Sequence, residues 1–248
     1  MSGHSKWANI KHRKGKADAE RGKIFTKIGR EIAIAVREGG ADPNVNGKLR
    51  DIIAKAKASN VPNDNITRSI KKAAGEGGNV VYEEISYEGY APNGVAIIAD
   101  VVTDNRNRVG SEIRHIFDRH GGSLATTGAV SYMFDFKGLL LIERSPAVDE
   151  DQLMLDALEA GAEDVQGSED GFEVYTAPGD FSAVREALEG KGYHFLSAER
   201  QKIPQTTVTL PDAEAEAKVR KLLSLLEDND DVMNVYHNAE LPEEEEEE

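Results

Sequence analysis

The 248-residue sequence contains no cysteine, which excludes disulfide bonds and thiolate chemistry and favours a reducing, cytoplasmic location. Aromatic residues are scarce at 6% of the chain, and Trp7 is the single tryptophan. No stretch approaches the ~20 consecutive apolar residues that a membrane-spanning helix needs. The first residues also lack the apolar run of a secretory signal. We therefore expect no membrane partner.

Acidic residues are absent from residues 1–17, although Asp and Glu outnumber Lys and Arg by 45 to 30 in the whole chain. Residues 1–75 carry 17 Lys and Arg against 7 Asp and Glu, a balance of +10. The remaining residues carry 13 against 38, a balance of −25. Cations on an N-terminal arm neutralise phosphates and release condensed counterions. This separation of charge predicts nucleic acid as the partner.

The candidate phosphate contacts run from this arm into the first predicted helix. They are Lys6, Trp7, Lys11, His12, Arg13, Lys14, Lys16, Arg21, Lys23, Lys27 and Arg30. Two interpretations of Trp7 are equally compatible with the sequence: stacking on a base, worth ~1–3 kcal/mol, or packing against the helices that follow. Phosphate contacts position a protein without reading base sequence, and the chain has no recognition-helix motif or RNA-binding aromatic signature.

Apolar residues recur at helical spacing over residues 18–75 and predict three short helices with basic outer faces. In the first helix, Ile24, Ile28, Ile32 and Val36 form the apolar stripe. We expect Asp64 to cap the third helix, whose outer face ends in Lys71 and Lys72. Beyond residue 79 the apolar period changes to two, which indicates strands.

Strands and helices alternate over residues 137–203 in the order βαββαβ, the ferredoxin-like arrangement. Its first helix, at 150–160, is expected to turn Leu153, Ala157 and Leu158 inward. A preceding unit contains a strand hairpin, a helix over 108–119 and short strands that include 129–136. That unit lacks a final helix and strand, which the helix at 213–227 and the strand at 232–237 would supply.

The sequence therefore predicts an α+β protein: an N-terminal three-helix basic domain followed by two ferredoxin-like α+β domains, one inserted in the other. The expected parts are a flexible basic arm at 1–20, a helical bundle at 21–78, a discontinuous α+β domain at 79–136 and 204–240, an inserted domain at 137–203, and an acidic tail at 241–248.

A second candidate site for an anion or a partner follows a predicted strand and opens a helix. It comprises Asp104, Asn105, Arg106, Asn107 and Arg108. Asp104 or Asn105 can cap the exposed N–H groups of the helix. Arg106 and Arg108 are suited to a phosphate or to a carboxylate, and a helix N-terminus itself attracts anions.

Catalytic chemistry is not indicated by the residue pattern. The six histidines show no paired metal-ligand spacing, and Asp118 lies roughly four helical turns from Asp104. A nucleophile elbow and a phosphate-binding loop are both absent. We therefore expect no enzyme activity, no metal and no cofactor.

Several motifs resemble those of the YebC/PmpR family. They are Gly3–Asn9 with the basic stretch that follows, Arg21–Phe25, Tyr87–Tyr90, Thr103–Arg108, Asp231-Val232 and Val235–Asn238. The resemblance covers the chain from end to end and implies three domains, a cytoplasmic bacterial location and no enzyme activity. Bacterial members are labelled as DNA-binding transcriptional regulators. A mitochondrial relative is similar to a translational activator, and bacterial members have been tied to ribosomes stalled on proline-rich stretches.

Charge and resemblance together predict a non-enzymatic, nucleic-acid-binding regulator of gene expression, with DNA as the first target. The alternative is a ribosome-associated translation factor that binds ribosomal RNA and relieves stalling, with ribosomal or transcription proteins contacting the acidic domains. A third possibility is an adaptor whose basic arm binds an acidic protein. Glu243–Glu248 is expected to be a solvated end, or to compete with nucleic acid for the basic arm.

Overall fold

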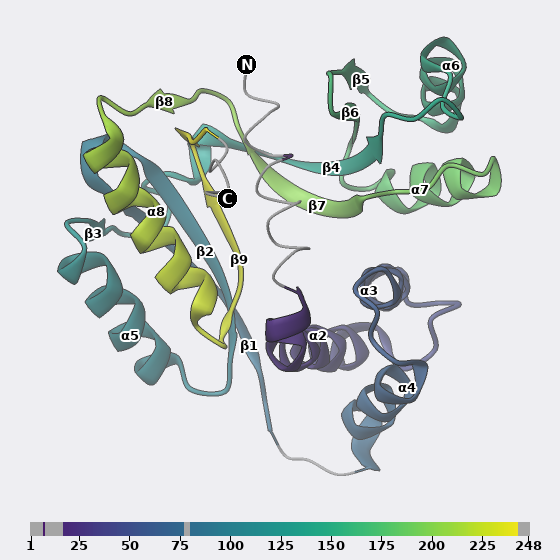
Figure 1. Ribbon diagram of the computed structural model, residues 1–248. Coiled ribbons are helices and arrows are strands. Elements are labelled where there is room, and N and C mark those ends of the chain that lie inside the picture. Colours follow the sequence, from purple (N-terminus) through teal and green to yellow (C-terminus); the bar gives the residue numbers. More distant parts are fainter. Residues whose placement is uncertain (1–6, 8–16, 77–79, 243–248) are drawn as a thin grey trace. The chain divides into compact units, whose positions relative to one another are not determined.

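The computed structural model describes residue 7, residues 17–76 and residues 80–242 (Figure 1). The chain divides into two compact units. One unit contains Trp7 and residues 135–203, and the other contains the N-terminal helices, residues up to 134 and the segment from 204 onward. No helix in the described ranges is long and apolar enough to cross a membrane. The protein has the mixed α+β fold that the sequence predicts.

Three helices form the N-terminal bundle: α2 (Ala17–Gly39), α3 (Gly47–Ala58) and α4 (Asn63–Lys71), which is followed by the helical turn η1 (Lys72–Glu76). Their shared core includes Ile28 and Ile32 of α2, Leu49 and Ile52 of α3, and Ile66 of α4. The apolar stripe predicted for the first helix is therefore confirmed. The predicted cap of the third helix is wrong, because Pro62 precedes α4 as its cap residue and Asp64 lies inside the first turn.

Asn46 joins the end of α2 to the start of α3. Its side-chain oxygen accepts a hydrogen bond from the Leu49 backbone N–H at 3.0 Å, which caps α3. Its amide nitrogen donates to the carbonyl oxygens of Ala35 and Gly40, both at 2.8 Å. One buried side chain thus satisfies backbone groups at the ends of two helices, and it fixes the turn between them.

The first sheet has the strand order β3-β1-β2-β9. Its strands are β1 (Glu83–Tyr90), β2 (Ala96–Thr103), β3 (Ser123–Leu124) and β9 (Val232–His237), and neighbouring strands are antiparallel. Helices α5 (Arg106–Arg119) and α8 (Ala213–Asp228) lie side by side over one face of the sheet (Figure 1). The hairpin that the sequence predicts is formed by β1 and β2.

Strand β2 is buried on both faces because it lies in the middle of the first sheet. Ile97, Ala99 and Val101 pack against α5 and α8 in one core. Ala96 and Ile98 point to the other face and pack with Val130 and Phe134. A central strand buried on both sides gives a continuous apolar run rather than an alternating one, and the sequence of β2 has this form.

The strand predicted over residues 129–136 is not formed as expected. Residues Ser131–Met133 form a 3₁₀ turn, η3, and the strand that starts at Phe134 belongs to the second sheet. The cause is Glu88 of β1, whose buried carboxylate accepts hydrogen bonds from the backbone N–H groups of Gly128, Val130 and Ser131 at 2.7, 2.7 and 2.9 Å. Those N–H groups are therefore unavailable for strand pairing.

The second sheet is formed by the continuous segment 134–204 with the order β5-β6-β4-β7. It contains β4 (Phe134–Glu143), α6 (Glu150–Ala160), β5 (Asp164–Gly167), β6 (Gly171–Thr176), α7 (Phe181–Gly190) and β7 (Ser197–Pro204). This βαββαβ order agrees with the sequence prediction. Leu153 and Ala157 of α6 are buried in the core as expected. Leu158, which was also expected inward, is 49% exposed.

A short parallel pair, β8 (Val208–Thr209) and β10 (Ala239–Glu240), completes the fold. The chain leaves for the second sheet after η3 and returns after β7. At this point the Gln205 N–H donates a hydrogen bond to the Met133 carbonyl oxygen at 2.9 Å. The residues that flank the segment 134–204 are therefore direct neighbours.

The capping role of Asn46 can be tested by the substitution Asn46→Ala. We expect the free energy of unfolding to fall by about 1–2 kcal/mol, because α3 loses its cap and two backbone carbonyl oxygens lose a donor. Urea unfolding followed by circular dichroism measures this change. Asn44→Ala in the same exposed turn is the control and should stay within ~0.5 kcal/mol of the native chain. Equal losses in both variants would contradict the role of Asn46.

Glu88 makes stability depend on pH in a predictable direction. Burial alone would raise the pKa of Glu88, but the backbone N–H groups of Gly128, Val130 and Ser131 outweigh it and lower the pKa below its ordinary value of 4.5. A lowered pKa in the folded state stabilises the fold above the unfolded-state pKa, and this stabilisation is lost as the pH falls through the folded-state pKa.

Glu88→Gln should therefore be less stable than the native chain by about 1–3 kcal/mol at pH 7. The difference should shrink as the pH falls below 4.5. Urea unfolding midpoints measured between neutral and acidic pH test this expectation. Glu83→Gln, an exposed change on the same strand, serves as the control. A difference that stays constant with pH would contradict the assignment.

Candidate nucleic-acid interface

The predicted phosphate-binding residues fall into two groups in the structure. Six of them lie outside the described residues: Lys6, Lys11, His12, Arg13, Lys14 and Lys16. The position of Arg21 on α2 is described, but its side chain is not. The structure therefore places Trp7, Lys23, Lys27 and Arg30, together with the second candidate site at 104–108.

Trp7 differs from both interpretations that the sequence allows. Its side chain is fully buried, and it packs with Leu139, Leu141, Tyr175 and Leu196 on the second sheet. The fit is close, because a Cβ atom at Gly171 would lie 2.6 Å from the indole ring. In this structure the indole therefore packs neither against the bundle helices nor as an open stacking surface for a base.

The cations of α2 form a stripe that faces the first sheet. Lys23, Lys27, Arg30, Ile34 and Arg37 follow one another at intervals of three or four residues, so they share one face of the helix. Ile34 lies in the middle of this stripe and is buried with Val102 and Met233. The stripe is thus a second contact face of α2, opposite to the face that packs in the bundle, with Ile34 buried at its centre and Arg37 exposed.

Each described cation of this stripe has a partner near the end of α8 or the strands beside it. Lys23 pairs with Asp228 at 3.3 Å, and Lys27 donates to the Glu227 carbonyl oxygen at 2.8 Å. Arg37 donates to the Tyr82 carbonyl oxygen at 2.6 Å. The positive charge of this face is used within the protein, which leaves less of it for phosphates.

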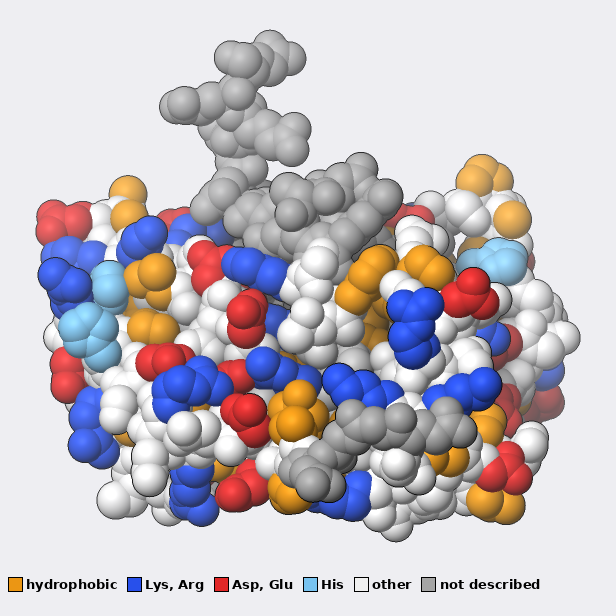
Figure 2. Space-filling model, turned by 90° about the horizontal axis from the view of Figure 1, so that it is seen from below, with side chains coloured by type: hydrophobic (Ala, Val, Ile, Leu, Met, Phe, Trp, Pro, Cys, Tyr) orange, Lys and Arg blue, Asp and Glu red, His pale blue; other side chains and the backbone are white. Residues whose placement is uncertain are grey.

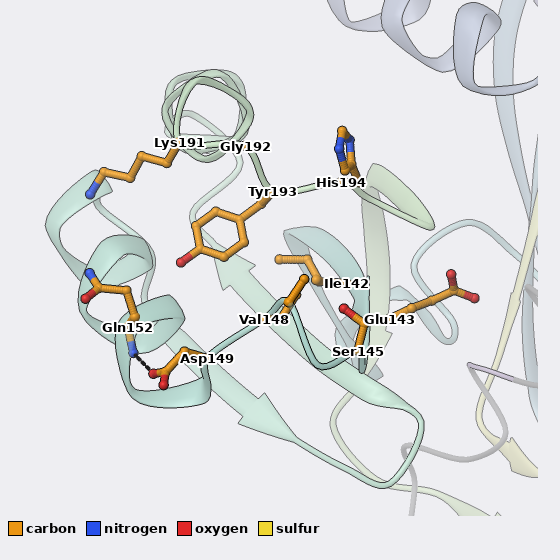
Figure 3. Close-up of a pocket in the computed structure, with 11 residues that line it drawn as sticks. Ile142, Glu143, Ser145, Val148, Asp149, Gln152, Lys191, Gly192, Tyr193 and His194 are labelled. Carbon is orange, nitrogen blue, oxygen red and sulfur yellow. Dashed lines mark hydrogen bonds between the residues drawn. The ribbon is translucent and has the colours of Figure 1, made fainter.

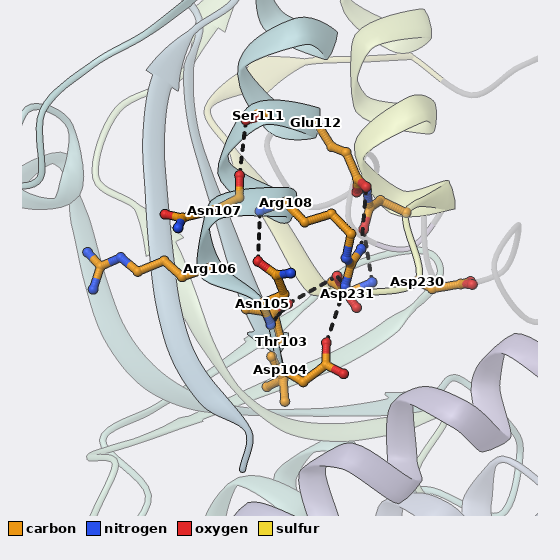
Figure 4. A network of polar contacts seen from close by, with 12 residues as sticks. Thr103, Asp104, Asn105, Arg106, Asn107, Arg108, Ser111, Glu112, Asp230 and Asp231 are labelled. Atoms are coloured by element: carbon orange, nitrogen blue, oxygen red, sulfur yellow. Dashed lines mark hydrogen bonds and ion pairs between the residues drawn. The ribbon is translucent and has the colours of Figure 1, made fainter. Parts of the chain in front are cut away.

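Asp231 is the centre of this contact (Figure 4). Its side chain is 1% exposed and forms ion pairs with Arg30 and, at 2.5 Å, with Arg108. The Thr103 hydroxyl donates a further hydrogen bond to it at 3.2 Å. Pairing with Asp231 raises the pKa of the Arg108 guanidinium above its ordinary value. Two arginines and a hydroxyl compensate the buried charge, as a buried carboxylate requires.

The residues of the second candidate site have different roles: helix capping, ion pairing and exposure to solvent. Asn105 caps α5, since its side-chain oxygen accepts a hydrogen bond from the Arg108 backbone N–H at 3.0 Å. The Arg108 guanidinium also reaches Asp104 at 3.4 Å and Glu112 at 3.3 Å. Arg106 points away from this network (Figure 4) and is exposed. Within the described residues, Arg106 is the member of this segment whose guanidinium has no partner.

A separate group of cations is exposed on the last helix of the bundle. Arg68, Lys71 and Lys72 lie at spacings of three and four residues over α4 and the start of η1, and all three are exposed. We call them the α4 basic patch. None of them has an ion-pair partner in the part of the chain that the structure describes. Lys57 at the end of α3 is also exposed and has no ion-pair partner there. Figure 2 shows that the surroundings of the cations differ: some Lys and Arg side chains lie beside acidic ones, and others lie apart from them.

The sequence pattern identifies Lys71 and Lys72 as the end of a basic face, and Arg68 is not among the residues predicted from it. Helical spacing could have found it, because Arg68 lies one turn before both lysines. Asp231 likewise has no role predicted from the sequence beyond its place in a motif. Its arginine partners Arg108 and Arg30 are 123 and 201 residues away in the sequence, so no local pattern could have identified them.

The second sheet unit also contains a concave region. A pocket of about 340 Å³ lies between the end of β4, the start of α6 and the loop after α7 (Figure 3). Lys191 at its wall pairs with Asp156 at 2.6 Å, and the Tyr193 hydroxyl donates to Asp156 at 2.8 Å. These two donors lower the pKa of Asp156. Lys191 and Tyr193 are therefore already paired. Across the described residues, no three His, Asp or Glu side chains form a metal-binding group.

Comparison with known proteins identifies similar chains over nearly the whole length. A family model described as the TACO1/YebC N-terminal domain matches residues 5–76, and one described as the TACO1/YebC second and third domain matches residues 82–239. A protein from Acetivibrio thermocellus is 61% identical over 238 residues, which are 96% of this chain and 98% of that one. A protein from Ruminiclostridium cellulolyticum is 60% identical over 248 residues, 100% of each chain. Both bear the name "Probable transcriptional regulatory protein".

A solved structure shares the fold. It is the crystal structure of a conserved hypothetical protein from Aquifex aeolicus, which is 46% identical to this chain. The two structures superimpose with a TM-score of 0.83 over 94% of this chain and 96% of that one. The mixed α+β fold described above is thus shared with a protein studied by crystallography.

The buried ion pairs of Asp231 lead to a stability prediction. Asp231→Asn keeps the side-chain shape but leaves Arg30 and Arg108 without their shared carboxylate. We expect a loss of about 2–4 kcal/mol in the free energy of unfolding, because breaking a buried pair leaves a charge uncompensated. Asp230→Asn is the matched control, since Asp230 is exposed and points away from the network (Figure 4). Chemical unfolding measures the free energy of unfolding of both variants. Equal values would refute the role of Asp231.

Proposed function

Because this chain belongs to the TACO1/YebC family, we propose that it is a nucleic-acid-binding regulator of gene expression whose N-terminal helices and arm contact phosphates. The name borne by the relatives, "Probable transcriptional regulatory protein", supports the regulatory role and makes duplex DNA the first target. The opposite charge balances of residues 1–75 and of the rest of the chain, +10 and −25, support the placement of the contact in the N-terminal part.

The observation that carries this proposal is the α4 basic patch. Arg68, Lys71 and Lys72 are exposed and unpaired among the described residues, in contrast to the engaged cations of α2. Asp64, the acid of α4, lies one turn before Arg68 and forms no ion pair with it. A cluster of cations that forms no ion pair within the described residues can neutralise adjacent phosphates and release their counterions.

The contact is proposed to be with the backbone rather than with base edges. Helix α4 spans nine residues, and its exposed face presents charged side chains at its C-terminal end. Helices that read the major groove contact bases from the residues at their N-terminal end. Lys and Arg contacts to phosphates position a protein without conferring base specificity. We propose a binding role without catalysis.

A ribosome-associated role is the second candidate, and the charge distribution favours it. Ribosomal RNA offers phosphates to the α4 basic patch, and A-form RNA is recognised mainly through its shape and backbone. The acidic remainder of the chain, with a balance of −25, suits contact with basic ribosomal proteins. Like charges keep this acidic part away from a second nucleic-acid surface, so it is suited to contact a protein.

The proposal predicts how affinity depends on salt. Binding of fluorescent duplex DNA, and separately of a ribosomal RNA fragment, is measured across a potassium chloride series for the native chain and for Arg68→Ala/Lys71→Ala/Lys72→Ala. Each lost phosphate contact should reduce the slope of log K against log salt by about 0.9 for duplex DNA. The triple variant should thus lose up to about 2.7 in slope. Its affinity should also fall at least tenfold near physiological salt.

The control variant removes the same charge elsewhere: Arg114→Ala/Lys218→Ala/Lys221→Ala changes three exposed cations of α5 and α8. It should bind like the native chain. Preferential retention of the RNA fragment, with co-sedimentation of the protein with ribosomes, would favour the translational role. Unchanged binding in the α4 variant would contradict the proposed surface. Failure to bind either nucleic acid, with retention of an acidic protein, would leave the adaptor role.

A further inference from the structure

Helix α6 of the second sheet carries an apolar face that nothing in the described protein covers. Met154, Leu155 and Leu158 are 40%, 58% and 49% exposed. They lie at helical spacings of one, three and four residues and therefore form one surface. Their neighbours Leu153 and Ala157 point to the opposite side, into the core. We call the three exposed side chains the α6 apolar face.

Such a face is unusual because exposed apolar side chains normally occur singly. Here three large side chains are adjacent on a helix of eleven residues. The core beneath them is already complete, with Leu153, Ala157, Val184 and Leu188 fully buried. The α6 apolar face is thus not needed to fold the second sheet.

Acidic side chains border this face. Glu150 and Asp151 lie at the start of the helix and Glu159 near its end, and all are exposed. Glu150 pairs with Arg144 at 3.3 Å and Glu159 with Lys191 at 3.5 Å, whereas Asp151 has no partner among the described residues. Residues 137–203 as a whole carry 15 Asp and Glu against 6 Lys and Arg, a balance of −9.

We propose that the α6 apolar face is the docking surface for a protein segment that has an apolar centre and a rim of Lys and Arg. The charge of the border argues for this occupant. A second copy of the chain would bring two acidic borders together, and an anionic lipid surface or a nucleic acid would be repelled in the same way. A basic rim complements the border and speeds association. An amphipathic helix of the partner can place its apolar residues against such a face.

This surface belongs to a different unit from the α4 basic patch, so the inference does not depend on nucleic-acid binding. It gives the protein two separate contacts of opposite character. Three side chains on one helix correspond to a small interface, of the kind found in transient complexes. We therefore expect reversible binding that is strengthened when another contact holds the partner nearby.

The test uses the full-length chain and a synthetic helical peptide with leucines on one face and lysines beside them. A second peptide has glutamates in place of the lysines. Binding is measured by fluorescence anisotropy. We expect the lysine peptide to bind the native chain at least tenfold more tightly than the glutamate peptide. The neutral double variant Leu155→Gln/Leu158→Gln should bind the lysine peptide at least tenfold more weakly than the native chain. Asp151→Lys should bind it severalfold more weakly.

Val45→Gln is the control, because Val45 is 78% exposed in the bundle and should bind like the native chain. Glutamine is a good helix former, and circular dichroism verifies the fold of each variant. Equal binding of the lysine peptide by the native chain and the double Gln variant would overturn the proposal, because the peptide would then be recognising charge alone. Self-association of the native chain in sedimentation velocity, or binding to phosphatidylglycerol vesicles, would overturn it as well if the double variant abolished either.

Discussion

The buried carboxylate of Asp231 is the interaction on which the arrangement of the larger unit depends. It lies at the start of β9 and is held by Arg30 of α2, by Arg108 of α5 and by the Thr103 hydroxyl at the end of β2. A charge with 1% exposure needs such compensation. The same requirement brings a helix of the bundle against the end of the first sheet. The cations of α2 that follow the same stripe are thereby engaged inside the protein.

The parts of the molecule that depend on local patterns could be predicted from the sequence, whereas ion pairs between distant residues could not. Periodicity found the helices of the bundle, the β1–β2 hairpin and the βαββαβ order of the second sheet, because each depends on local patterns. It could not assign Lys23, Lys27 and Arg30 to an internal contact, since their partners lie about 200 residues away. A clue was present in Ile34, an apolar residue in the middle of a basic stripe. Similarly, the turn found in place of the strand expected over residues 129–136 is held by Glu88, which lies forty residues from Gly128 in the sequence.

Several residues of the motifs that suggested a family turn out to support the fold. Glu88 holds the turn before β4, Asn105 caps α5, and Trp7 fills a site on the second sheet. The α4 basic patch and the α6 apolar face lie outside those motifs. Motif residues thus identify the architecture, whereas the surfaces proposed to bind partners had to be found from exposure and pairing. The phosphate-binding role of the arm residues remains a prediction from sequence, and that of the α4 basic patch is a proposal argued from its exposure in the structure.

The hydrogen bond between Gln205 and Met133 bears on how one folding unit can be inserted into another. The two points where the chain leaves and re-enters the first-sheet unit are held next to each other. Closely spaced ends are what allow one folding unit to be placed inside another without distorting the host. The second sheet, with its own core, can therefore change its surface as a separate module, while the host keeps the bundle and its cations in place.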